Sequence, residues 1–226
     1  MNNYFRISSL SSSLPISHIV RAASTRSEPF PCKSSLHLDI LLLMIHNLAV
    51  FCASANGANP IYSEAAEHLG RTLAQRNIGL IYGGATVGLM SAVAESCLAH
   101  GGRVVGVIPE VLVDLEVAHQ GITELHITDT MHTRKALMGQ KADAFLILPG
   151  GFGTFEEMFE VLAWQTLKIH QKPIVLLNIN GFYDKLLTFL DHCVDEGMLK
   201  PKNRKILLVA NTVEDALAQF SANITA

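Results

Sequence analysis

Short runs of consecutive apolar residues alternate with longer amphipathic stretches over most of this chain. Apolar runs of this kind are typical of strands that are buried on both faces of a parallel sheet. The predicted strands cover residues 48–54, 78–84, 103–109, 123–128, 144–151, 173–179 and 205–210. The amphipathic stretches predict helices over residues 59–77, 88–102, 131–142, 153–170, 182–197 and 212–220. The alternation therefore predicts an α/β fold, with a doubly wound, Rossmann-like parallel sheet that carries helices on both faces.

Residues 1–43 do not follow this alternation. They are rich in Ser and contain arginines, but no acidic residue occurs before Glu28. That composition is typical of a transit peptide or a disordered leader, and Met44 leaves a third reading, an extension upstream of the true start. We expect a leader over residues 1–43 and a single domain over residues 44–226, with the chain from Met44 onward sufficient for folding and activity. The protein is expected in the cytoplasm, with organelle targeting by the leader left open.

The apolar stretch over residues 36–55 resembles the hydrophobic region of a secretory signal, followed by small residues. Asp39, His46 and Asn47 interrupt it, and cleavage after Ala55 would remove a strand that the fold needs. No stretch of the sequence is long and apolar enough to span a bilayer, so no membrane partner is expected.

The composition argues against several other partners. The net charge is −3 and the pI is about 6.3, so the chain lacks the clustered basic side chains that bind nucleic-acid phosphates. Its four cysteines are widely spaced, without C-x-x-C, which is typical of reduced thiols in a cytosol-like compartment. Its ten histidines form no H-x-x-x-H or H-x-H pair. We therefore expect no nucleic acid, no metal and no cofactor.

Two glycine clusters follow predicted strands and precede predicted helices. The first contains Gly83, Gly84 and Gly88, and the second contains Gly150, Gly151, Phe152, Gly153 and Thr154. Glycine lets a ligand approach the backbone, and a helix N-terminus offers N–H groups and partial positive charge, so such turns bind phosphate. The alternative is a tight turn that binds nothing, but two clusters at one sheet edge favour an anion. Neither cluster matches the dinucleotide or P-loop motif.

Two acids, Glu156 and Glu157, follow the second cluster directly. Thr154 and Glu157 have the spacing of a capping box, which offers a purely structural reading of Glu157. A carboxylate beside a phosphate would repel it, however, so it must face the neutral sugar of a nucleotide or pair with a cation. Arg134 and Lys135, at the start of another predicted helix, provide two cations whose side chains point roughly 100° apart. Their alternative is a solvated helix face.

Several segments together resemble the LONELY GUY family, the cytokinin riboside 5′-monophosphate phosphoribohydrolases. The segment PGGFGTFEE at residues 149–157 matches P-G-G-x-G-T-x-x-E, and MHTRK at 131–135 precedes it at the expected distance. Further matches are VFCAS, YGGATVGLM, GGRVVGVIP, GITELH and KPIVLLNINGFYDKLLTFLDHCVDEG. The resemblance spans residues 48–220, and the leader lies outside it.

The resemblance implies an enzyme that cleaves the N-glycosidic bond of an adenine-type nucleoside 5′-monophosphate, releasing the base and ribose 5-phosphate. It implies that Arg134 and Glu157 are the catalytic pair and that the nucleotide site is lined by Lys135, Gly150, Gly151, Gly153, Thr154 and Glu156. It also implies a homodimer or a higher homo-oligomer. Departures from the family pattern are Ala85 in the first glycine cluster, Ala163, and Gln165 with Thr166. They leave the implied chemistry intact and affect the expected substrate preference and rate.

This function has two alternatives. A non-catalytic nucleotide or cofactor carrier can share this fold, but it need not retain both Arg134 and Glu157. An older family description, lysine decarboxylase, requires a Schiff-base lysine with a pyridoxal phosphate site. Lys135 and Lys141 lie in helical segments without a recognisable pattern of cofactor partners.

Overall fold

The computed structural model describes residues 45–116 and 118–223, so the predicted leader lies outside the described part. Its strands form one sheet in the order β4-β3-β2-β1-β5-β6-β7, and every neighbouring pair is parallel. The strands are β1 (Asn47–Phe51), β2 (Gly79–Tyr82), β3 (Val104–Pro109), β4 (Glu124–Thr128), β5 (Ala144–Ile147), β6 (Ile174–Leu177) and β7 (Leu207–Ala210). Each predicted apolar run overlaps one of these strands, and β1 begins one residue before its run, so the parallel sheet is confirmed.

Helices connect the strands along the chain. They are α2 (Ile61–Gln75), α3 (Gly88–Ala99), α4 (Glu110–Glu116), α5 (Met131–Lys141), α6 (Phe152–Thr166), the 3-10 turn η1 (Ile179–Gly181), α7 (Asp184–Asp195), α8 (Pro201–Arg204) and α9 (Val213–Asn223). The six predicted helices are all present. The short elements α4, α8 and η1 were not predicted.

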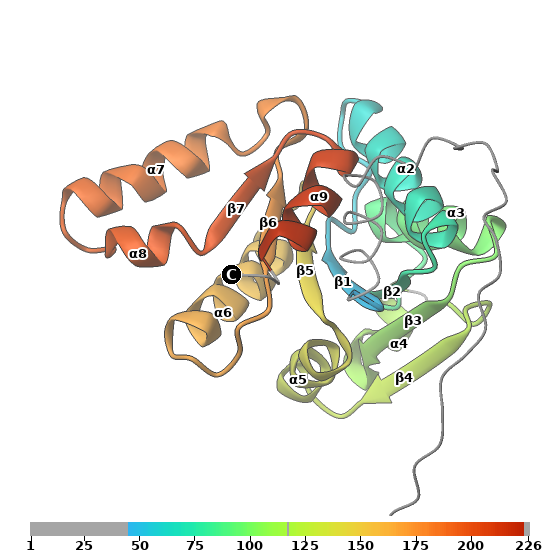
Figure 1. The fold of residues 1–226 in the computed structure, drawn as a ribbon. Coiled ribbons are helices and arrows are strands. Elements are labelled where there is room, and N and C mark those ends of the chain that lie inside the picture. Colours follow the sequence, from blue (N-terminus) through green and yellow to red (C-terminus); the bar gives the residue numbers. More distant parts are fainter. Residues whose placement is uncertain (1–44, 117, 224–226) are drawn as a thin grey trace, which may run out of the picture. The chain divides into compact units, whose positions relative to one another are not determined.

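The two faces of the sheet carry two hydrophobic clusters because side chains alternate along each strand. On β1, Leu48 and Val50 belong to the cluster beneath α2, α3 and α9, whereas Ala49 and Phe51 belong to the cluster beneath α5, α6 and α7. Figure 1 shows α2 and α9 on one side of the strands and α5 and α6 on the other. The predicted doubly wound arrangement is thereby confirmed.

The strand order reverses at β1. This strand pairs with β2 on one side and with β5 on the other, although the chain visits β2, β3 and β4 before β5. In an open parallel sheet such a reversal leaves a crevice at the carboxyl ends of the two diverging strands, and ligands bind there. Both predicted glycine clusters follow strands at this edge, one after β2 and one after β5.

Within the part of the chain that the structure describes, no helix is both long enough and apolar enough to cross a membrane.

Candidate active site

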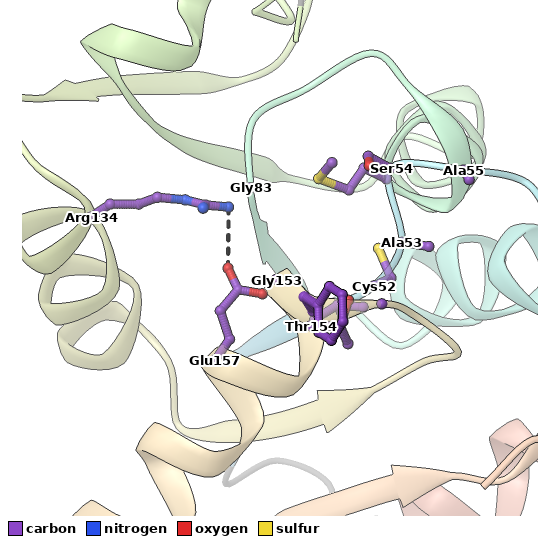
Figure 2. Close-up of a pocket in the computed structure, with 13 residues that line it drawn as sticks. Cys52, Ala53, Ser54, Ala55, Gly83, Arg134, Gly153, Thr154 and Glu157 are labelled. Atoms are coloured by element: carbon purple, nitrogen blue, oxygen red, sulfur yellow. Dashed lines mark ion pairs between the residues drawn. The ribbon is translucent and has the colours of Figure 1, made fainter. Parts of the chain in front are cut away.

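A cavity of about 240 Å³ lies at the carboxyl ends of β1, β2 and β5. It is lined by Val50, Cys52, Ala53, Ser54, Ala55, Gly83, Met90, Arg134, Gly151, Phe152, Gly153, Thr154 and Glu157. Figure 2 shows Arg134 and Glu157 pointing toward one another from two helices, with the segment from Cys52 to Ala55 on another side. The cavity therefore coincides with the crevice expected from the strand order.

Backbone hydrogen bonds hold the walls of this cavity together. The N–H of Ala53 donates to the carbonyl oxygen of Pro149 at 3.2 Å, and the N–H of Leu89 donates to that of Ala53 at 3.1 Å. Gly88, with φ +56°, lets the start of α3 approach the loop after β1, because a Cβ there would lie 2.3 Å from the backbone nitrogen of Ala55. The loops after β1 and β5 and the first turn of α3 therefore form one connected wall.

Arg134 reaches the cavity from the first turn of α5. Thr130 caps this helix, since its hydroxyl accepts the N–H of Thr133 at 3.1 Å. The Nε–H of Arg134 donates to the carbonyl oxygen of Val107 on β3 at 3.1 Å, and the whole residue is only 7% exposed. Gly83 makes room for the guanidinium, because a Cβ there would lie 2.5 Å from its Nη2 atom. The guanidinium is thus fixed across the end of β2.

Glu157 faces Arg134 from α6, and its Oε1 lies 3.2 Å from Nη2 of the guanidinium. Both side chains are 8% exposed, so this ion pair is buried. The capping-box reading of Thr154 is wrong: the N-cap is Gly151, and no side-chain hydrogen bond caps the helix. The helix starts earlier because the glycines permit the turn, so Thr154 lies inside the helix. Its side chain is buried against Gly150, since a Cβ on Gly150 would lie 2.1 Å from the threonine hydroxyl.

Glu156 and Lys135, the neighbours of Glu157 and Arg134 in the chain, form a second ion pair outside the cavity lining. Lys135 pairs with Glu156 and, at 3.0 Å, with Glu160. The two acids that follow the glycine turn are therefore each paired with one of two consecutive cations on α5, which is one of the two arrangements expected for a carboxylate beside a phosphate.

The predicted site residues divide into two groups. Arg134, Glu157, Gly83, Gly151, Phe152, Gly153 and Thr154 line the cavity. Gly84, Gly88, Gly150, Lys135 and Glu156 do not line it, and they surround or support it. Gly84 has φ +80° and allows β2 to end close to β3. Ala85, the departure from the family pattern, does not need positive φ, so the turn tolerates it.

Six lining residues were not predicted as site residues: Val50, Cys52, Ala53, Ser54, Ala55 and Met90. Val50 lies on β1, the next four follow it directly, and Met90 lies in the first turn of α3. Their side chains carry no charge pattern, and the loop after β1 lacks a glycine cluster next to the strand. Their signal is positional, since they lie on, follow or face the central strand at which the order of the sheet reverses.

The Cys52 thiol lies in the cavity but is a poor nucleophile. Burial raises its pKa well above the usual range, the carboxylate of Glu157 raises it further, and the guanidinium of Arg134 opposes these effects. Because the thiolate is the reactive form, the protonated thiol reacts slowly. We expect iodoacetamide at about pH 8 to label the partly exposed Cys193 well before Cys52, as followed by peptide mass spectrometry. Equal labelling rates would contradict this electrostatic description.

The fold and the site together define a class of Rossmann-like proteins. In this class, a cavity at the point where the strand order reverses contains a buried carboxylate and a buried guanidinium. Both lie beside the N-terminus of a helix, a feature that favours anions. Comparison with known proteins specifies this class further. The family described as "Possible lysine decarboxylase" matches residues 90–220. "Cytokinin riboside 5′-monophosphate phosphoribohydrolase LOG7" of Arabidopsis thaliana is 47% identical over 174 residues, covering 76% of this chain and 80% of that protein.

A bacterial relative gives the same result. The "Cytokinin riboside 5′-monophosphate phosphoribohydrolase" of Rhodococcoides fascians is 47% identical over 173 residues, covering 76% of this chain and 87% of that protein. The chain belongs to the LONELY GUY family, which confirms the prediction from its motifs.

Solved structures share the fold at lower identity. The molybdenum cofactor binding protein from Rippkaea orientalis has a TM-score of 0.61 and 20% identity, covering 79% of this chain and 96% of that one. The Moco carrier protein from Chlamydomonas reinhardtii has a TM-score of 0.59 and 20% identity, covering 79% and 97%. At this identity the likeness establishes the Rossmann-like fold alone.

Proposed function

We propose that this protein hydrolyses the N-glycosidic bond of adenine-type nucleoside 5′-monophosphates, cytokinin nucleotides among them, to give the free base and ribose 5-phosphate. The observation that carries the proposal is the buried pair of Arg134 and Glu157 in a cavity that also contains the start of α6. Relatives named for this reaction are 47% identical to the chain.

The start of α6 is suited to the 5′-phosphate. The first N–H groups of a helix have no partner within it, and the helix dipole adds positive charge there. Gly151 and Gly153 line the cavity at this point, and a Cβ at either would meet no atom within 4 Å, so the space beside their backbone is open. Binding energy from the phosphate would then be used to position the sugar.

The carboxylate of Glu157 is suited to the ribose. Cleavage passes through an oxocarbenium-like state, in which the C1′–N bond breaks, its electron pair leaves with the base, and positive charge develops on the sugar ring. Glu157 stabilises that charge and takes a proton from the attacking water, whose oxygen bonds to C1′. The proton taken from the water is then transferred to the nitrogen of the departing base that was bonded to C1′. The reaction therefore consumes one water and needs no other reactant.

Arg134 has two roles that fit its contacts. Its Nε–H donates to the carbonyl oxygen of Val107, which fixes the guanidinium, and its Nη2 lies against Glu157, which orients that carboxylate. The guanidinium also offsets the negative charge that Glu157 would otherwise present to a phosphate in the same cavity.

Decarboxylation through a Schiff base is disfavoured by the state of the lysines near the site. Burial alone would lower the pKa of Lys135, but its hydrogen bonds to Glu156 and Glu160 outweigh burial and raise it. A Schiff base requires the neutral amine, so these contacts oppose that chemistry. Lys141, also on α5, is paired at 3.0 Å with Glu124, the first residue of β4, whereas the cavity lies at the carboxyl ends of the strands.

The test is base release across a matched set of substrates, measured by chromatography. We expect release from AMP or isopentenyladenosine 5′-monophosphate to exceed release from the unphosphorylated nucleosides about 1,000-fold, because the phosphate positions the sugar. Triphosphates should also be poor substrates. Equal rates of base release from nucleosides and from their 5′-monophosphates would show that the helix N-terminus does not bind the phosphate during the reaction. Nucleotide binding without base release would favour a carrier protein.

Two further properties belong to the same proposal. Free thiols at Cys52, Cys97 and Cys193 support a cytoplasmic location. Met131 and Phe152, which are 37% and 93% exposed, place apolar surface beside the cavity, which supports a homodimer with its sites near the interface. Light scattering after size-exclusion chromatography measures the oligomeric state.

A further inference from the structure

A cluster of charged side chains lies directly behind the candidate catalytic pair. It consists of Lys135 on α5 with Glu156 and Glu160 on α6, and none of the three lines the cavity. The lysine side chain is 6% exposed, against 52% for Glu156 and 20% for Glu160. The ammonium group of Lys135 is therefore the most buried member of the cluster, and it contacts both carboxylates.

The cluster and the catalytic pair join the same two helices at neighbouring positions. Lys135 follows Arg134 on α5, and Glu156 precedes Glu157 on α6. Consecutive side chains on a helix point in different directions. The pair of Arg134 and Glu157 therefore enters the cavity, whereas the contact of Lys135 with Glu156 joins the two helices outside the cavity lining. The position of one pair is therefore tied to that of the other.

The ammonium group also neutralises repulsion within α6. Glu156 and Glu160 are spaced i, i+4 and lie on one face of the helix, where like charges destabilise it. With Lys135 between them, both acids are held toward α5. Without it, no charge contact would hold these two acids to α5, so α6 would be less restrained at this point and Glu157 could move with its helix.

We propose that Lys135, together with Glu156 and Glu160, acts as a positioning clamp that sets the separation of Arg134 and Glu157 and does not contact the nucleotide. This inference rests on the proposed function. It assigns to Glu160 a role that the motif does not give, and it reassigns Lys135 and Glu156 from the nucleotide site to its support. A misplacement of about 1 Å at a reacting group can reduce a rate about 100-fold, so such a clamp affects turnover.

The first experiment replaces Lys135 by methionine, which keeps the length of the side chain and removes its charge. We expect kcat for base release to fall about 100-fold while KM changes by less than about threefold, because the nucleotide contacts remain. Lys135→Arg should restore most of kcat because it keeps the charge. The matched control is Lys141→Met on the same helix, which removes only the contact with Glu124 and should leave kcat and KM unchanged.

A double-mutant cycle tests whether the clamp acts as a unit. Glu160→Gln should lower kcat less than Lys135→Met, since Glu156 still holds the lysine. Lys135→Met combined with Glu160→Gln should have a kcat no lower than that of Lys135→Met alone, because the shared contact is already lost. Glu160→Gln alone still tests the clamp if Lys135→Met does not fold.

The outcomes separate this inference from the function on which it rests. A wild-type protein that releases no base would contradict the proposed function itself. With an active wild type, a Lys135→Met variant whose KM rises more than about tenfold at unchanged kcat would show that Lys135 binds the nucleotide, and the clamp would be overturned. Unchanged kcat and KM, or strictly additive losses in the cycle, would overturn it as well.

Discussion

Glu157→Gln is expected to abolish base release while nucleotide binding survives. Glutamine has nearly the same shape as glutamate, and its amide oxygen can still accept from the guanidinium of Arg134, so the cavity keeps its form. It cannot stabilise the developing charge on the ribose or take a proton from water. We expect a loss of about 1,000-fold or more in kcat, the upper range for a group that acts as general base and charge stabiliser.

Binding and turnover must be measured separately for this variant. Isothermal titration calorimetry with AMP should give a Kd within a few-fold of wild type, and chromatography of the released base gives kcat. Glu214→Gln is a suitable control, because it removes an exposed acid on α9 that pairs with His68, far along the chain from the cavity lining. Activity equal to wild type in Glu157→Gln would remove this carboxylate from the mechanism.

The sheet could be predicted because each of its strands corresponds to a continuous apolar run in the sequence. The four residues of β2 and the four of β5 are all buried. Gly83 follows β2 directly, and Pro149 and Gly150 follow β5 after Leu148. The short helices escaped prediction for a related reason. Helix α4 follows β3 without a loop, and α8 is one turn without an apolar residue after its proline, so neither has a readable period.

The residues that line the cavity were predicted where their type is unusual, and missed where only their position brings them there. Arg134 and Glu157 are charged, and the glycine clusters are unusual in composition, so the sequence marks them. Cys52 and Met90 are ordinary apolar residues that reach the cavity because β1 lies between β2 and β5. Strand order depends on which crossover packs on which face, and the sequence alone does not state it.

The same limit explains Lys135 and Glu156. The motif gives their spacing in the chain, and the resemblance places them with the nucleotide. The direction of each side chain depends on the rotation of α5 and α6, which is set by packing beneath them. Met138 on α5 and Met158 and Val161 on α6 are buried in the same cluster under the sheet, and this burial turns Lys135 toward Glu160 rather than into the cavity.

Arg134→Met should be nearly inactive and should be destabilised more than Glu157→Gln, in which the amide oxygen can still accept from the guanidinium. Removing the guanidinium leaves the buried carboxylate of Glu157 without that cation, and breaking a buried pair in this way costs about 3 kcal/mol of unfolding free energy. We expect kcat to fall at least about 100-fold, because the carboxylate is no longer oriented toward the sugar. Urea denaturation and base release measure the two effects.

The double variant Arg134→Met with Glu157→Gln separates stability from catalysis. Since it removes both charges of a buried pair, the neutral side chains should recover most of the lost stability, whereas activity should stay as low as in Glu157→Gln. Arg134→Lys tests geometry in the same way, because an ammonium group cannot reproduce the planar fork that contacts Val107 and Glu157 together. Full activity in Arg134→Lys would show that only a positive charge is needed, and a double variant as unstable as Arg134→Met would show that the guanidinium stabilises the fold through contacts other than Glu157.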